Sequence, residues 1–134
     1  MQIFLSYKQT GLDKKNLKKE LSSIKKIIEN TNNEVYIYLF EELIDENPIK
    51  LVKLFKQKIK KSNLVIGLIN NIEKSEGELL ELGLAEALNK KILLLVNNNI
   101  KPYYSLIYGL NADIIYYDDI SDLEILLINY LKGK

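Results

Sequence analysis

The chain alternates between two hydrophobic patterns: short continuous apolar runs, and longer segments in which apolar residues recur every three or four positions. The short runs are rich in β-branched and aromatic side chains, as expected of strands. They cover residues 3–7, 35–40, 64–69, 91–96 and 113–117. The run at 64–69 has no polar position, which is typical of a strand covered on both faces.

Helical periodicity fills the intervals between these runs. Leu17, Leu21, Ile24 and Ile28 recur at helical spacing and predict a helix over residues 13–30. Further helices are predicted over residues 47–61, 75–90 and 104–109, and a last one from residue 121. Asn47-Pro48 is typical of a helix cap followed by the first helical residue, and the last helix begins with a Ser-Asp-Leu-Glu capping box.

Five strands that alternate with five helices predict an α/β fold, a parallel sheet sandwiched between helices in one domain over residues 1–134. We expect the flavodoxin-like strand order 2-1-3-4-5. In such sheets ligands bind beyond the carboxyl ends of the strands, where the winding direction reverses between the first and third strands. Residues 6–11, 40–42 and 70–81 are predicted to meet there.

Composition narrows the class of protein. Apolar residues make up 47% and charged residues 28% of the chain, as in soluble globular proteins. Membrane helices need about 18 uncharged apolar residues in a row, and the chain has no such window. The first predicted strand follows Met1 directly, so we expect no signal peptide. We therefore expect a cytoplasmic protein. A net charge of +1 argues against a nucleic-acid partner.

Cys, His and Arg are absent from the sequence, and each of these absences excludes chemistry. Without Cys there is no thiolate nucleophile, and without His there is no Ser-His-Asp triad and no imidazole ligand for zinc. Without Arg, a phosphate must be held by Lys, hydroxyls, backbone N–H groups or a helix end. Acid–base or nucleophilic work falls to Asp, Glu, Tyr, Lys and Ser.

The helix and strand at residues 75–95 are the segment in which we expect the function to lie. Helical spacing places Gly77, Glu81 and Ala85 on one line, so small residues leave space on both sides of the Glu81 carboxylate. The helix N-terminus near Ser75 and Gly77 suits an anionic group. Glu81 is the candidate reactive residue and Ser75 with Gly77 the candidate anion site.

A purely structural explanation exists for each of these residues. Ser75 and Glu78 fit a capping box, in which both only stabilise the helix start. Gly83 and Ala85 are compatible with close packing of the helix on the sheet, and Glu81 is a favourable residue anywhere in a helix. A Glu between small residues at the point where the winding reverses is nevertheless poorly explained as an ordinary surface position.

Two polar loops are expected to face this helix. The loop after the first strand can cradle a phosphate or a sugar, although many strand-to-helix loops are equally polar. Its candidate residues are Ser6, Tyr7, Lys8, Thr10 and Gly11. Glu41 and Glu42 follow the second strand, where either could accept a hydrogen bond from a ribose hydroxyl or remain a solvated charge.

The pattern Ser-x-Gly-x-x-x-Glu-x-Gly-x-Ala, followed by Lys-Lys-Ile-Leu-Leu-Leu, resembles the signature of nucleoside 2-deoxyribosyltransferases and the related 2'-deoxynucleoside 5'-phosphate N-hydrolases. The resemblance extends to Ile-Phe-Leu-Ser-Tyr-Lys-Gln-Thr-Gly at the start of the chain and to Tyr-Ser-Leu-Ile-Tyr-Gly before the last strand. Toll/interleukin-receptor domains are more distantly similar and have a catalytic Glu of their own.

The resemblance implies a role for each matching residue. The position of Glu81 is the nucleophile that attacks the anomeric carbon of the sugar, with Tyr7 nearby to orient its carboxylate. In the resemblance, serine at position 75 implies that the substrate is a 5'-monophosphate, because an Asp at the same position would repel the phosphate dianion. Ser105 resembles a residue that the neighbouring subunit lends to the phosphate site, which implies a homodimer. The families imply no metal and no cofactor.

One departure from the family pattern concerns a second carboxylate. The families usually have an Asp in the helix before the third strand, where this chain reads Leu-Phe-Lys-Gln-Lys at residues 54–58. Either Glu41 or Glu42 takes over its role, or the catalytic site is incomplete. Three hypotheses follow: an N-glycosidic-bond enzyme acting on a nucleoside or nucleotide, an NAD glycohydrolase, and a non-catalytic nucleotide-binding module.

Overall fold

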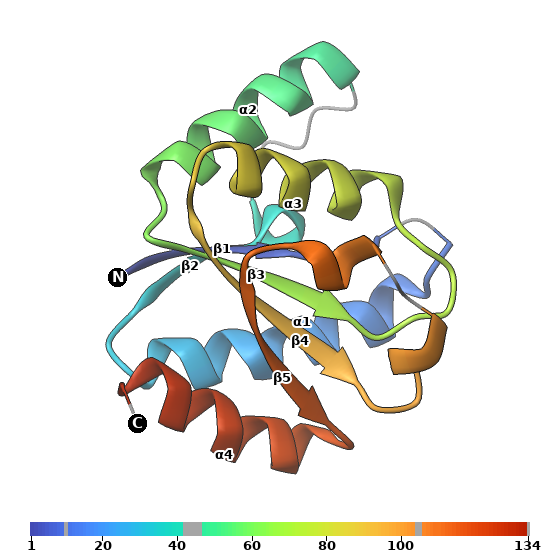
Figure 1. Ribbon diagram of the computed structural model, residues 1–134, viewed down its shortest axis with the longest axis vertical. Helices are drawn as coiled ribbons and strands as arrows, with labels where there is room; N and C mark the ends of the chain where they lie inside the picture. The colour runs from blue at the N-terminus through green and yellow to red at the C-terminus, as the bar shows by residue number, and fades with distance from the viewer. Residues whose placement is uncertain (10, 42–46, 104–105, 134) are drawn as a thin grey trace.

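A five-stranded parallel sheet with the order β2-β1-β3-β4-β5 forms the centre of the computed structural model, which describes residues 1–9, 11–41, 47–103 and 106–133 (Figure 1). This order confirms the predicted fold class and topology. All four strand pairs are parallel, so the carboxyl ends of the strands lie at one edge. The strands are β1 (Gln2–Ser6), β2 (Glu34–Tyr36), β3 (Leu64–Ile69), β4 (Lys91–Asn97) and β5 (Ala112–Tyr117).

Helices cover both faces of the sheet. One face packs against α1 (Lys14–Glu29) and α4 (Ile120–Leu131), and the other against α2 (Pro48–Lys61) and α3 (Glu76–Ala87) (Figure 1). Three short 3₁₀ helices lie in the connections: η1 (Tyr38–Phe40), η2 (Lys101–Tyr103) and η3 (Leu106–Gly109). None of the helices in the described part of the chain is long and apolar enough to cross a membrane.

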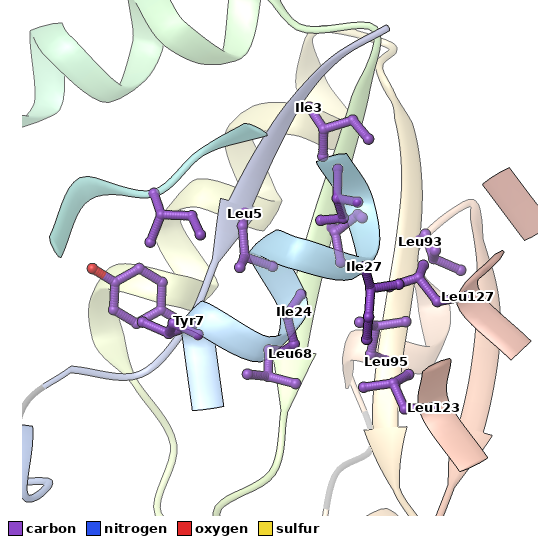
Figure 2. Close-up of a cluster of buried hydrophobic side chains, with 14 of the residues drawn as sticks. Ile3, Leu5, Tyr7, Ile24, Ile27, Leu68, Leu93, Leu95, Leu123 and Leu127 are labelled. Atoms are coloured by element: carbon purple, nitrogen blue, oxygen red, sulfur yellow. The ribbon is translucent and has the colours of Figure 1, made fainter. Parts of the chain in front are cut away.

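The two layers of helices explain the continuous apolar run of β3. Leu64, Ile66 and Leu68 belong to the cluster packed on α1 and α4, and Val65 and Ile69 to the cluster packed on α2 and α3. Figure 2 shows the first cluster, in which side chains from α1 and α4 converge on the central strands. Since successive side chains of a strand point to opposite faces, a strand buried on both sides has no polar position.

The strand predicted over residues 35–40 is wrong from residue 37 onward. β2 ends at Tyr36, and the chain turns into η1 at Tyr38. The N–H of Phe40 donates to the carbonyl of Ile37, and the N–H of Leu39 donates to the hydroxyl of Tyr7. These backbone donors are therefore satisfied outside the sheet, although the residues are as apolar as those of a strand.

Helix boundaries differ from the predictions at two places. The last helix is capped by Asp119, whose carboxylate accepts from the N–H of Asp122, rather than by Ser121. The helix predicted over 75–90 ends at Ala87, because Asn89 adopts a left-handed conformation with φ of 56°. The short helix predicted over 104–109 is described only as η3, since residues 104 and 105 lie outside the described residues.

Gly67 in the middle of β3 sets how closely α3 approaches the sheet. A Cβ atom at this position would lie 3.0 Å from Cδ2 of Leu82 and 3.1 Å from Cδ2 of Leu94. The glycine expected to serve this purpose, Gly83, is exposed and has open space around it, whereas Ala85 is fully buried as expected. Gly67 thus allows Leu82, and with it the neighbouring residue Glu81, to sit against the sheet.

Candidate active site

Glu81 lies at the edge of the sheet where the winding direction reverses between β1 and β3. Its side chain is 8% exposed, and its Oε1 accepts a hydrogen bond of 2.6 Å from the hydroxyl of Ser6. Ser6 is the last residue of β1 and is completely buried. This contact joins two of the three segments that the sequence predicts to meet. Sequence reasoning did not anticipate this bond: it makes Ser6 a candidate ligand contact, and the structure shows that the Ser6 hydroxyl holds the Glu81 carboxylate.

Burial dominates the electrostatics of Glu81. Loss of solvent raises the pKa of its carboxyl from 4.5 to about 7, and the hydrogen bond from Ser6 acts in the opposite direction. A carboxyl with a pKa near neutrality is a candidate for acid–base or nucleophilic chemistry in an enzyme.

Glu78 is a second buried carboxyl on the same helix. It was expected to be part of a capping box, and half of that box is present, since the N–H of Glu78 donates to the Ser75 hydroxyl at 3.1 Å. The Glu78 side chain, however, is turned inward and only 3% exposed. Burial and the charge of Glu81 raise its pKa well above the ordinary value.

Tyr7 connects the end of β1 to η1, which leads into the third predicted segment at Phe40. Its hydroxyl accepts a 2.8 Å hydrogen bond from the N–H of Leu39 in η1. Burial raises the pKa of the Tyr7 phenol, the Leu39 hydrogen bond opposes this, and the nearby negative charge of Glu81 raises it further. Tyr7 is therefore close to Glu81, as the family resemblance implies, but the hydrogen bond that holds the carboxylate comes from Ser6.

Aromatic rings line the region between β1, η1 and α2. Phe4 stacks on Tyr36 with centroids 5.6 Å apart, and Phe55 meets the edges of Phe4 and Tyr38 at 6.3 and 5.3 Å. The Tyr36 hydroxyl is buried and has no hydrogen-bond partner within the described residues. Burial, followed by the charges of Glu41, Tyr38 and Glu81, raises its pKa to about 12. The cluster is largely enclosed, since Phe4 and Tyr38 are buried and the Tyr36 ring lies between Phe4 and the Nζ of Lys58, 5.0 Å from the ring centroid.

The helix α2 supplies no carboxylate to this region. Its residues 48–61 contain neither Asp nor Glu, and its aromatic side chain Phe55 packs into the cluster around Tyr38. The departure from the family pattern seen in the sequence therefore persists in the structure. Glu41, one of the two proposed substitutes, is exposed, and its charge raises the pKa of Tyr36. The other, Glu42, lies outside the described residues.

The remaining predicted residues are distributed around this centre. Lys8 follows β1 and is 8% exposed, and its positive charge acts on Glu78. Ser75 caps α3, and Gly77 is exposed with open space beside it. Gly11 is exposed and has a φ of 78°, a conformation that favours glycine. Two further candidates, Thr10 and Ser105, lie outside the described residues.

A separate hollow opens on the α1 and α4 side of the sheet. It has a volume of about 430 Å³ and is lined by Glu20, Asn70, Tyr117 and Asp118 among others. Neither Glu81 nor Glu78 lines it. Across the described residues, His, Cys, Asp and Glu side chains nowhere gather in a group of three suited to a metal ion.

Comparisons with known proteins place these features in context. Neither a scan of protein-family models nor a search of curated proteins finds a match. Solved structures do match. The chain is similar to the CMP N-glycosidase BcmB of Clostridium botulinum, with a TM-score of 0.77 and 27% identity over 97% of this chain and 99% of that chain.

Two further neighbours support the fold alone, since they share less sequence. One is a 2-deoxyribosyltransferase from the psychrotolerant bacterium Bacillus psychrosaccharolyticus, with a TM-score of 0.58 and 19% identity over 92% of this chain and 90% of that chain. The other is a conserved protein from Enterococcus faecalis V583, with a TM-score of 0.73 and 15% identity over 99% and 98% of the two chains.

Proposed function

We propose that this chain, whose fold is that of the nucleoside 2-deoxyribosyltransferase-like superfamily, is an enzyme that cleaves or transfers at the N-glycosidic bond of a nucleoside or nucleotide, with Glu81 as nucleophile. The observation that carries the proposal is the Ser6–Glu81 hydrogen bond, which fixes a buried carboxylate where α/β sheets bind ligands. The similarity to a CMP N-glycosidase and a 2-deoxyribosyltransferase supports the type of bond.

The proposed reaction has two steps. In the first, a carboxylate oxygen of Glu81 forms a bond to the anomeric carbon while the bond from that carbon to the base nitrogen breaks, and the electron pair leaves with the base, which takes up a proton. In the second, water attacks the same carbon, the ester bond to Glu81 breaks, and the water proton is released. Transfer to another base in place of water gives a new nucleoside.

The hydrogen bond from Ser6 serves the first step. Ser6 donates to Oε1 of Glu81, so it fixes the orientation of the carboxyl group and leaves Oε2 available for attack. A pKa of about 7 means that a substantial part of the Glu81 population is ionised at neutral pH. Burial also strips the carboxylate of solvent, which makes it a stronger nucleophile than an exposed glutamate.

The surroundings of Glu81 support a nucleotide as substrate. Tyr36 and Phe55 are the half-buried rings of the aromatic cluster, and the Tyr36 hydroxyl is without a partner within the described residues. At the other side, the N-terminus of α3 at Ser75 and Gly77 offers backbone N–H groups for a 5'-phosphate, with open space beside Gly77. We therefore include a 5'-monophosphate in the proposal.

The test is to measure release of free base by chromatography from CMP, dCMP, the other nucleoside monophosphates, the corresponding nucleosides and NAD. The proposal expects turnover of at least one nucleotide, and Glu81→Gln is expected to lower kcat at least 1,000-fold, on the order of the loss seen when a nucleophile is removed. Glu124→Gln is the control, because Glu124 is an exposed glutamate on α4, on the opposite face of the sheet from α3.

Each other outcome points to a different function. Full activity of Glu81→Gln would contradict the mechanism. If NAD is the one compound that is cleaved, the substrate is a dinucleotide and not a nucleoside monophosphate. Nucleotides that raise the melting temperature without being consumed would favour a binding module and overturn the proposed enzyme activity.

A further inference from the structure

Glu78 is the more deeply buried of two carboxyl groups that lie three residues apart on α3. It is 3% exposed, against 8% for Glu81. Its Oε2 has no hydrogen-bond partner within the described residues and no contact with solvent. Residues three apart on a helix are neighbours on its surface, and the charge of Glu81 does act on Glu78. The site therefore contains a second carboxyl, although α2 does not supply it.

Groups from every element around Glu78 determine its charge state. Glu81 on α3 opposes ionisation, and Lys8 at the end of β1 favours it, as does the backbone of Leu68 on β3. On β5 the phenol of Tyr117 is close enough to sense the charge of Glu78. Burial is the largest influence, and it opposes ionisation.

An ionised carboxylate in this position would be poorly compensated. One of its oxygens would carry charge with neither solvent nor a hydrogen-bond donor, beside a second carboxylate one turn away. Like charges that share a site cannot easily both ionise, so such a pair loses its protons in two separate steps. Each group has contacts that favour its ionised form, Ser6 at Glu81 and Lys8 with the Leu68 backbone at Glu78. Glu78 is nevertheless the more deeply buried, and within the described residues its Oε2 has no donor.

We propose that Glu78 is a positioning residue of this site: it retains its proton at neutral pH, so that the single negative charge of the pair lies on Glu81, its neighbour one turn along α3. The proposal rests on the proposed function, in which Glu81 is the nucleophile. Glu78 acts through Glu81 and does not itself bond to the substrate. Once Glu81 becomes an ester in the covalent intermediate, the charge that opposes ionisation of Glu78 disappears.

The pH dependence of kcat/KM separates this role from a structural one. Activity of the wild type rises as Glu81 loses its proton and falls at higher pH, when ionised Glu78 places a second negative charge in a site for an anionic substrate. In Glu78→Gln, a neutral side chain of the same shape, the rise stays at the wild-type pH, the fall disappears, and kcat/KM at pH 7 stays within about three-fold. Glu124→Gln, at an exposed glutamate on α4 on the opposite face of the sheet, leaves both limbs in place.

Two results would overturn the proposal. If Glu78 is ionised at neutral pH, its replacement removes a negative charge beside Glu81, and the rise in activity moves to lower pH by a unit or more. If folded Glu78→Gln, checked by circular dichroism, is inactive over the whole pH range, the carboxyl has another role than the one proposed.

A measurement on the free protein keeps the inference independent of turnover. Carbon-13 NMR of protein labelled at the glutamate carboxyl carbon follows each Glu through a pH titration, and the Glu78 resonance is the one that Glu78→Gln removes, or is assigned through the backbone if that variant does not fold. At pH 7 the chemical shift of this resonance is expected to be that of a protonated carboxyl group. Titration near the ordinary value of about 4.3 would overturn the proposal even if no nucleotide is cleaved; a protonated Glu78 in a protein without activity would contradict only the proposed function.

Discussion

Ser6 and Glu81 are 75 residues apart in the chain, and the hydroxyl of the first donates a 2.6 Å hydrogen bond to the carboxylate of the second. The bond connects the end of strand β1 to the second turn of α3. Within the described residues it is the one hydrogen bond to the Glu81 carboxylate, and it lowers the pKa that burial raises. Ser6 thus ties the ionisation of Glu81 to the geometry of the sheet.

Ser6→Ala is expected to raise the pKa of Glu81, because the hydrogen bond that favours the carboxylate is lost while burial remains. A hydrogen bond to a charged group is worth about 1.5–3 kcal/mol, which corresponds to a shift of roughly one to two pH units. The acid limb of kcat/KM moves to higher pH by this amount, and activity at pH 6 falls about ten-fold or more. Ser23→Ala removes only a hydroxyl bonded within α1 and is the control. An unchanged acid limb would show that the bond does not set the ionisation of Glu81.

Glu81→Gln is expected to make the protein more stable at neutral and alkaline pH. The folded protein holds the Glu81 proton up to about pH 7, whereas an ordinary Glu loses it near 4.5, so stability falls as pH rises between these values. Removing the ionisable group recovers up to about 3 kcal/mol of unfolding free energy at pH 8 and nothing at pH 4. Urea denaturation at both pH values measures the difference. A variant less stable than the wild type at pH 8 would contradict the raised pKa.

Gly67→Ala is expected to destabilise the protein, because its Cβ would lie 3.0 Å from Leu82 and 3.1 Å from Leu94. Overpacking of this kind costs about 1–3 kcal/mol, and displacement of Leu82 also moves the adjacent Glu81, so kcat falls as well. Gly83→Ala is the matched control on the facing helix. Its Cβ meets open space, and alanine in place of glycine inside a helix gains roughly 0.5–1 kcal/mol. Equal melting temperatures for the two variants would exclude the packing role of Gly67.

The elements of this fold were predictable where burial is regular, and the site was predictable only in part. The strand Leu64–Ile69 was found to the residue, because a fully apolar run has one explanation in a parallel sheet. Glu81 was singled out by the small residues around it. Gly67 was overlooked because a glycine inside such a run gives no sign of what it faces.

Glu78 shows why the rest could not be read from the chain. A Glu three residues after a Ser at a helix start matches a capping box, and the backbone half of that box exists. Its side chain is buried, where it senses the charge of Lys8, from a segment far earlier in the chain, and the backbone of Leu68 on β3. Local patterns predict local contacts, and the charge of a buried carboxyl depends on contacts that are not local.

Tyr36→Phe separates a ligand-binding hydroxyl from one that is merely buried. The Tyr36 hydroxyl is sequestered from solvent without a hydrogen-bond partner within the described residues, so its removal is expected to raise the free energy of unfolding by about 1 kcal/mol or more. If the hydroxyl binds the nucleotide, the same variant raises KM about ten-fold with little change in kcat, because the bond is made equally in the ground and transition states. Thermal unfolding and steady-state kinetics on one preparation measure both effects. A more stable variant with unchanged KM would show that the hydroxyl does not contact the substrate.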